Sequence, residues 1–127
     1  MKHGLIKVAA AIPAVKVADT KFNLIETEKQ ITVADGQGVE IIVFPELSMT
    51  GYTCQDLFQQ QLLLDDTEQA VIELLEFTRK LDITVIVGAP VAVGALLLNC
   101  ALVIQQGKLL GIVAKTFLPN YSEFYEK

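Results

Sequence analysis

The sequence has very little histidine, cysteine or arginine, and these shortages exclude several kinds of site. The single histidine, His3, stands near the N-terminus, which excludes a histidine-dependent catalytic triad and a histidine metal cluster. The two cysteines, Cys54 and Cys100, are too few for a zinc site or a disulfide framework. The sequence does not exclude one disulfide between them. The sequence therefore predicts no metal site.

Positive charge is also scarce. The sequence has 10 Lys+Arg, of which only Arg79 is an arginine, and 15 Asp+Glu. The net charge is therefore −5, and the pI is near 4.8. Nucleic acids and anionic lipids are bound by clustered Lys and Arg, so we expect neither as a partner.

Long apolar runs are missing as well. No run approaches the roughly 18 residues that span a membrane. The apolar start of the chain is broken by Pro13 and followed by Lys16, which favours a buried strand over a signal peptide. We therefore expect a cytoplasmic protein without a membrane partner.

Apolar residues, in contrast, are abundant. They make up 52% of the 127 residues, which excludes a disordered chain and allows one domain with a sizeable core. A mean hydropathy of +0.45 is high for a self-sufficient domain. It indicates surface that another part of the structure covers.

Apolar strand-like segments alternate with amphipathic helical ones. Strands are predicted over 5–12, 39–44, 83–89, 96–105 and 108–115, and helices over 20–35 and 67–81. Asp19 or Thr20 and Asp66 are the expected N-caps, Gly36 is the expected left-handed stop, and Gln106-Gly107 is the expected hairpin turn. A Glu76–Lys80 pair is expected on the second helix. The order β-α-β-α-β-β-β indicates a layered α/β fold whose sheet becomes mixed or antiparallel.

Three charged residues follow apolar segments: Glu46, Lys115 and Glu123. In α/β sheets, ligands and catalytic groups gather at the carboxyl ends of strands, so a glutamate base and a stabilising lysine could meet there. The alternative interpretation is that all three residues are solvated charges at the surface, which the same spacing allows. Cys100 reads as a small buried apolar residue, whereas Cys54 lies in a polar, aromatic loop segment and is the more plausible nucleophile of the two.

Two segments are more specific. FPELSMTGY (44–52) and KTFLPNYSEFYEK (115–127) resemble the first two signature blocks of the nitrilase, or carbon-nitrogen hydrolase, superfamily. GYTCQDLF and LPNYSEFYEK resemble more narrowly the N-terminal glutaminase domain of glutamine-dependent NAD synthetases. The resemblance runs along all 127 residues.

The resemblance implies an α-β-β-α sandwich, four-layered on dimerisation, with a Glu-Lys-Cys amidase mechanism. Within the motifs, Glu46 matches the general base, Lys115 the stabiliser of the oxyanion, and Glu123 a second glutamate of the site. Substrate-binding positions are implied for Tyr121 and, more weakly, for Tyr52 and Phe124. The implied small-molecule partner is glutamine, and this domain is expected to need no cofactor. A lysine beside two glutamates should keep its proton and act as a fixed positive charge.

The family nucleophile is a cysteine of a third block, and neither Cys54 nor Cys100 occupies its position. Residues 1–127 are therefore expected to be the N-terminal portion of a carbon-nitrogen hydrolase domain and to be inactive alone. The ATP-dependent synthetase domain of these enzymes, to which ATP and Mg²⁺ belong, is also expected outside this chain. That domain would use the ammonia to convert deamido-NAD to NAD.

Two other functions stay open. The chain could belong to a stand-alone nitrilase-family amidase or carbamoyl hydrolase, or it could be a non-catalytic oligomerisation or interaction module. A part of such a sandwich leaves sheet edges and a core face uncovered, so we expect a homo-oligomer or poor solubility.

Overall fold

The structure is a computed structural model that describes residues 4–51, 61–94 and 96–115. These residues form one sheet and two helices in the order β-α-β-α-β-β-β, as the sequence predicts. The elements are β1 (Val8–Ala10), α1 (Thr20–Gly36), β2 (Ile41–Val43), α2 (Gln61–Thr78), β3 (Thr84–Val93), β4 (Leu96–Gln105) and β5 (Lys108–Ala114).

Helix α1 begins where the sequence predicts. The carboxylate of Asp19 accepts a hydrogen bond of 3.0 Å from the backbone N–H of Phe22, which satisfies a free amide of the first turn. Leu24, Thr27 and Ile31 recur at helical spacing and are buried. The stop, however, is not at Gly36, which is the last helical residue. The left-handed conformation belongs to Gly38, with φ of 76°.

Helix α2 begins at Gln61, earlier than predicted, so Asp66 lies within the helix and is not its cap. The hydroxyl of Thr67 donates to the carbonyl oxygen of Leu63 at 2.8 Å, one turn back in the same helix. At the other end, Glu76 pairs with Arg79 at 3.1 Å, where a pair with Lys80 was expected. The predicted helix ran to Leu81, whereas α2 ends at Thr78, so Lys80 lies beyond the helix and lacks the four-residue helical spacing to Glu76 that the predicted pair needs.

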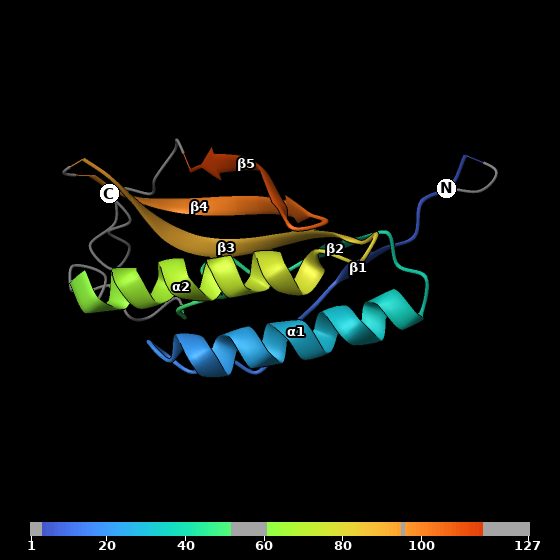
Figure 1. The fold of residues 1–127 in the computed structure, drawn as a ribbon, viewed down its shortest axis with the longest axis horizontal. Coiled ribbons are helices and arrows are strands. Elements are labelled where there is room, and N and C mark those ends of the chain that lie inside the picture. Colours follow the sequence, from blue (N-terminus) through green and yellow to red (C-terminus); the bar gives the residue numbers. More distant parts are fainter. Residues whose placement is uncertain (1–3, 52–60, 95, 116–127) are drawn as a thin grey trace.

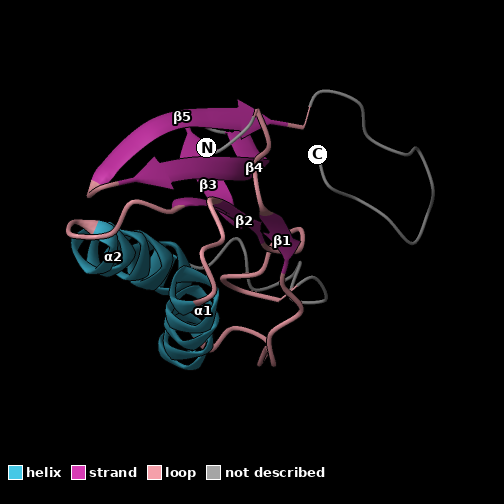
Figure 2. Cartoon of the chain, turned by 90° about the vertical axis from the view of Figure 1, so that its right-hand side faces the viewer, coloured by secondary structure: helices cyan, strands magenta, loops and turns pink. Residues whose placement is uncertain are grey.

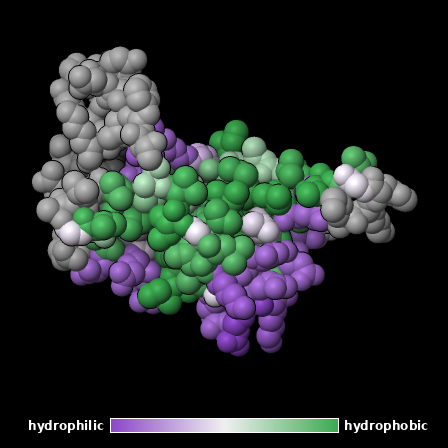
Figure 3. Space-filling view, turned by 90° about the horizontal axis from the view of Figure 1, so that it is seen from above, coloured by the Kyte–Doolittle hydropathy of each residue, from purple (hydrophilic) through white to green (hydrophobic). Residues whose placement is uncertain are grey.

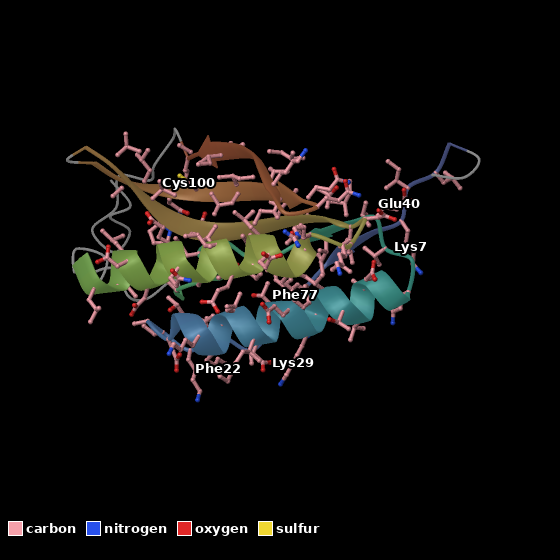
Figure 4. The ribbon with its side chains drawn as sticks, viewed as in Figure 1. Lys7, Phe22, Lys29, Glu40, Phe77 and Cys100 are labelled. Atoms are coloured by element: carbon pink, nitrogen blue, oxygen red, sulfur yellow. The ribbon has the colours of Figure 1, made fainter. Side chains whose placement is uncertain are left out.

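The sheet is mixed, with strand order β1-β2-β3-β4-β5. The first three strands are parallel and joined through the helices, whereas β3, β4 and β5 form an antiparallel meander. Both helices lie side by side on one side of the sheet (Figures 1 and 2). At the start of β2, the N–H of Glu40 donates to the carbonyl oxygen of Lys7 at 2.8 Å, and Figure 4 shows these two residues at one end of the sheet.

The turn between β4 and β5 is the predicted one. Gln106 and Gly107 have φ of 50° and 79°. A type I′ turn, which suits a two-residue hairpin, needs a positive φ at both of these positions. The N–H of Gly107 donates to the hydroxyl of Thr78 at 3.1 Å. The hairpin is thereby fixed to the C-terminal end of α2.

The two faces of the sheet differ sharply. Val85, Val87, Leu102 and Ile104 point toward the helices and are almost fully buried in the core. The alternate residues form what we call the open face, which carries Val8, Val43, Ile86, Val103 and Val113. Val8 and Val113 are 63% and 62% exposed. Seen from above, hydrophobic residues extend across the middle of the molecule (Figure 3).

The described residues thus contain one helix layer and one sheet layer of α/β type. The second sheet and second helix layer of the expected α-β-β-α sandwich stay a prediction. Neither α1 nor α2 combines the length and apolar character that a membrane span needs.

Candidate active site

The direction of the strands brings two predicted site residues to the same end of the sheet. Since β4 is antiparallel to both β3 and β5, strand β5 runs in the same direction as β2. Glu46 follows the carboxyl end of β2, and Lys115 follows that of β5. The end of the sheet where ligands are expected to gather therefore holds one predicted residue from the parallel half and one from the antiparallel half.

The two side chains meet across the sheet. Lys115 Nζ lies 3.3 Å from Glu46 Oε1, although 69 residues separate them in the sequence. Strands β3 and β4 lie between β2 and β5, a span of roughly 14 Å at the usual strand spacing of about 4.8 Å. Long side chains are needed to bridge that span, and Glu and Lys provide them.

Small residues lie beneath the pair. Gly88 of β3 and Ala101 of β4 are direct partners in the sheet, and Ala101 is in turn paired with Val113 of β5. All three line a pocket of about 320 Å³ that also contains Glu46 and Lys115. The other lining residues are mostly apolar: Val43, Phe44, Pro45, Ile86, Val87, Asn99, Cys100 and Ala114.

A compact turn carries Glu46. The N–H of Ser48 donates to the carbonyl oxygen of Pro45 at 3.1 Å, and the N–H of Gly51 donates to that of Leu47 at 2.8 Å. Leu47 itself has a φ of 53°, a left-handed conformation that few residues with a branched side chain adopt. Strain of this kind concentrates at functional sites, where the surrounding structure imposes it.

Strand β3 holds this turn in place. The N–H of Met49 donates to the carbonyl oxygen of Gly88 at 3.0 Å, and the N–H of Gly88 contacts the hydroxyl oxygen of Ser48 at 3.3 Å. Just before the turn, the N–H of Phe44 donates to the carbonyl oxygen of Ile86 at 2.9 Å. On the other side of the pocket, the N–H of Lys115 donates to the carbonyl oxygen of Asn99 at 3.0 Å, which extends the β4–β5 ladder by one residue. Both charged residues therefore stand on backbone that is hydrogen-bonded to the sheet.

The pair is only partly exposed. The side chain of Lys115 is 32% exposed and that of Glu46 is 41% exposed. A carboxylate can take up and return a proton, and an ammonium group can stabilise negative charge that develops nearby. A pocket of this size is within the range of sites for small molecules, which begins at about 300 Å³. The arrangement suits acid–base chemistry on a small polar substrate.

Cys100, the described cysteine, is a poor nucleophile. It carries a free thiol, it is 3% exposed, and its burial raises the pKa of the thiol. Alternation along β4 places its side chain on the same side as Leu102, in the core beneath the sheet. It packs as the small buried apolar residue that the sequence indicated.

The remaining candidates cannot be placed. Tyr52, Cys54, Tyr121, Glu123 and Phe124 lie outside the described residues. Within residues 4–51, 61–94 and 96–115, no group of three or more His, Cys, Asp or Glu side chains is arranged to hold a metal ion.

Comparison with known proteins shows the family and the fold of the chain. Residues 7–127 match the family model described as carbon-nitrogen hydrolase. The chain belongs to this family. It is 35% identical over 126 residues to a glutamine-dependent NAD(+) synthetase of Mycobacterium tuberculosis, which covers 99% of this chain and 19% of that protein. It is 43% identical over 101 residues to the enzyme of that name from Aquifex aeolicus, covering 78% of this chain and 18% of that one.

Solved structures show the same fold. The crystal structure of a glutamine-dependent NAD(+) synthetase from Cytophaga hutchinsonii superposes with a TM-score of 0.84 at 30% identity, over 91% of this chain and 20% of that chain. An amidase of the nitrilase superfamily from Nesterenkonia superposes with a TM-score of 0.79 at 21% identity, over 93% and 45% of the two chains. The chain thus spans about a fifth of the length of the synthetases it matches.

Two residues that contact the turn carrying Glu46, Gly88 and Asn23, were not predicted from the sequence. Gly88 follows the β-branched run 83–87, and a glycine within a strand often marks the close approach of another backbone segment. Asn23 is a polar residue beside the inward stripe of α1, and it is fully buried. The glycine within a strand and the polar residue beside an apolar stripe can both be recognised in the sequence. The sequence does not show which segment each of them contacts.

Proposed function

We propose that this chain is part of the glutaminase domain of a glutamine-dependent NAD synthetase. The domain would hydrolyse glutamine, and a synthetase domain outside this chain would use the ammonia for the ATP-dependent conversion of deamido-NAD to NAD. The observation that carries the proposal is the 3.3 Å contact between Lys115 and Glu46 in an apolar pocket at the carboxyl ends of β2 and β5. The identity to synthetases over nearly the whole chain supports the choice of substrate.

In the proposed reaction, a cysteine thiol from outside this chain attacks the carboxamide carbon of glutamine. Glu46 accepts the thiol proton, and the ammonium group of Lys115 stabilises the oxyanion of the tetrahedral intermediate. The C–N bond then breaks, and the proton held by Glu46 passes to the leaving ammonia. Water attacks the resulting thioester, gives one proton to Glu46, and releases glutamate; the proton then returns to the thiol.

The other members of this site are carried over from the family resemblance. Glu123 is proposed as a second glutamate beside Lys115, and Tyr121, with Tyr52 and Phe124, as contacts of the substrate. We propose no cofactor for this domain, and ATP and Mg²⁺ only for the synthetase domain. Because the nucleophile lies elsewhere, the 127-residue chain should be inactive. Glutamine hydrolysis by the purified chain, abolished by Cys54→Ala, would overturn this.

The test uses the complete protein encoded by the reading frame that contains this chain, assayed for glutamate and ammonia release. Glu46→Gln should lower kcat by roughly 100-fold or more, because it removes the proton acceptor. Lys115→Gln should lower kcat by roughly 100- to 1,000-fold, because it removes the oxyanion stabiliser. The matched controls are Glu26→Gln and Lys29→Gln, which break a 3.1 Å Glu–Lys pair on the surface of α1 and should leave kcat unchanged. Full activity in Glu46→Gln would contradict the proposal.

A substrate panel distinguishes the second candidate function, a stand-alone amidase or carbamoyl hydrolase, which the match to the carbon-nitrogen hydrolase family also permits. Turnover of simple aliphatic amides without turnover of glutamine would support the amidase. Absence of all turnover by the complete, folded protein would support a non-catalytic module.

A further inference from the structure

Asn23 connects three parts of the structure through its side chain. It is 1% exposed. Its Oδ1 accepts a hydrogen bond of 2.8 Å from the backbone N–H of Lys16, and its Nδ2 donates to the carbonyl oxygen of Lys16 at 2.9 Å. The same Nδ2 donates to the carbonyl oxygen of Met49 at 2.9 Å. A residue of α1 thereby binds both the segment before the helix and the turn that carries Glu46.

These two segments also contact each other. The N–H of Ala18 donates to the carbonyl oxygen of Thr50 at 2.7 Å. A β-carbon on Gly51 would come within 3.1 Å of the α-carbon of Val17, so the two backbones pack closely. Asn23 lies where α1, the segment around Lys16 and the turn at Met49 converge.

Met49 is held from both sides. Its N–H donates to the carbonyl oxygen of Gly88 on β3, and its carbonyl oxygen accepts from Asn23 on α1. The turn is therefore clamped between the sheet and the helix, and Glu46 is only three residues from Met49. We propose that Asn23 is a positioning residue that fixes the Glu46 carboxylate in front of Lys115. Its catalytic consequence rests on the proposed role of Glu46.

The amide side chain is specific to this role. It offers an acceptor and a donor group in one plane, and this buried site uses both. Aspartate would match the shape of asparagine but would present an oxygen to the carbonyl oxygens of Lys16 and Met49. Alanine would leave those groups without their partner, and an unpaired buried polar group is costly.

The first test measures amide hydrogen exchange in the 127-residue chain. In Asn23→Ala and Asn23→Asp, the amides of Met49 and Gly51 should exchange at least about tenfold faster relative to that of Val87 in β3, because one side of the clamp is lost. The matched control is Leu24→Ala, which removes a buried side chain of the same helix turn and leaves the Asn23 contacts intact. It should accelerate all of these amides together.

A second readout follows Glu46 itself. The ¹³C resonance of its carboxyl group should shift in Asn23→Ala in the same direction as in Lys115→Gln, because both changes weaken the contact with Lys115. Leu24→Ala should leave the resonance in place. An unchanged Glu46 resonance in Asn23→Ala, or equal acceleration of all amides, would overturn the proposal.

In the complete protein, Asn23→Ala should lower kcat by roughly 10- to 100-fold, the usual effect of a displaced catalytic group, with KM changed less than about threefold. Leu24→Ala, assayed well below its unfolding temperature, should retain kcat. If Glu46→Gln retains activity while Asn23→Ala still loosens the turn, the general-base role is wrong and the positioning of the turn stands. If Glu46→Gln is inactive and Asn23→Ala has full kcat, the positioning role is wrong.

Discussion

The backbone at Leu47 passes so close to Gly88 that a β-carbon on Gly88 would overlap the Leu47 amide nitrogen. It would also come within 2.9 Å of the carbonyl oxygen of Pro45. Both neighbours are backbone atoms of the turn that carries Glu46, so they cannot move aside as a flexible side chain would. This contact determines how closely the turn can approach β3.

The Gly88→Ala variant tests this contact. The added methyl group should push the turn away from β3 and lower the free energy of unfolding by about 1–3 kcal/mol, the usual cost of overpacking. The control is Gly111→Ala on β5, where a β-carbon would meet nothing within 4 Å. There stability should be unchanged or raised by up to about 1 kcal/mol. Urea denaturation measures both, and equal effects would contradict the contact.

Two buried threonines should respond oppositely to loss of their hydroxyl groups. Within the described residues, the hydroxyl of Thr27 on α1 makes no hydrogen bond, so Thr27→Val should be neutral or stabilise the protein by up to about 1 kcal/mol. The hydroxyl of Thr78 on α2 donates to Leu75 and accepts from Gly107. Thr78→Val should therefore cost about 1–3 kcal/mol.

Both threonines are fully buried, so each variant is the control for the other. Thermal unfolding of the two variants, run in parallel, gives the comparison. A loss of stability in Thr27→Val as large as in Thr78→Val would show that packing, and not the hydrogen bond, decides the effect.

The interface between the helices should make stability depend on pH. Burial, and secondarily the nearby carboxylate of Glu73, raise the pKa of Glu28 above its ordinary value. Protonation of Glu28 is therefore more favourable in the folded state than in the unfolded state. This contribution to stability is present below the ordinary pKa and is lost as the pH rises through the raised value.

The Glu28→Gln variant removes this dependence. Relative to the original protein, it should be more stable near pH 7 and should lose most of that advantage near pH 3, which is well below the ordinary glutamate pKa of about 4.3, so that Glu28 is largely protonated in both states. Glu73→Gln should give a smaller gain of the same sign near neutral pH, because it removes the secondary cause. Urea unfolding at both pH values is the measurement. A Glu28→Gln advantage that grows on acidification would contradict the assignment.

The open face should make the chain associate. Its residues Val8, Val43 and Val113 are exposed on strands that have no covering layer within the described residues, and apolar surfaces of this kind drive association. Light scattering at high protein concentration should show dimers or larger species. Val113→Lys, on the open face, should shift them toward monomer, whereas Ile25→Lys, on the exposed side of α1, should not. A monomer at all concentrations would count against the expectation.

Local sequence signals predicted much of this fold. The Asp19 cap and the Gln106-Gly107 turn depend on neighbouring residues only, and the structure confirms both. The start of α2 was wrong for a physical reason. Asp66 has the sequence pattern of a cap, but a cap contributes only about 1 kcal/mol. Extending the helix to Gln61 buries Leu63, and that packing outweighs the local preference.

The site was predictable only in part. Glu46 and Lys115 were singled out because each follows an apolar strand. The two strands run in the same direction, which places both residues at the same end of the sheet. The contact of Asn23 with Met49, in contrast, joins a helix to a turn 26 residues away. No periodicity or spacing marks such a contact, because it depends on how the layers pack.

The position of Lys115 just beyond β5 also has a consequence for the order of folding. Strands β3, β4 and β5 are joined by short turns, whereas β1 and β2 pair only after a helical crossover has closed. Contacts distant in sequence form slowly, so pulse-labelled amides of Ile104 in the meander should be protected before those of Ala11 beside β1. Lys115 follows the meander, which forms early, whereas Glu46 follows β2, which joins the sheet only after a helical crossover has closed. The contact between Lys115 and Glu46 would then form only after β1 and β2 have paired with the meander. Its formation therefore indicates that the whole sheet has assembled.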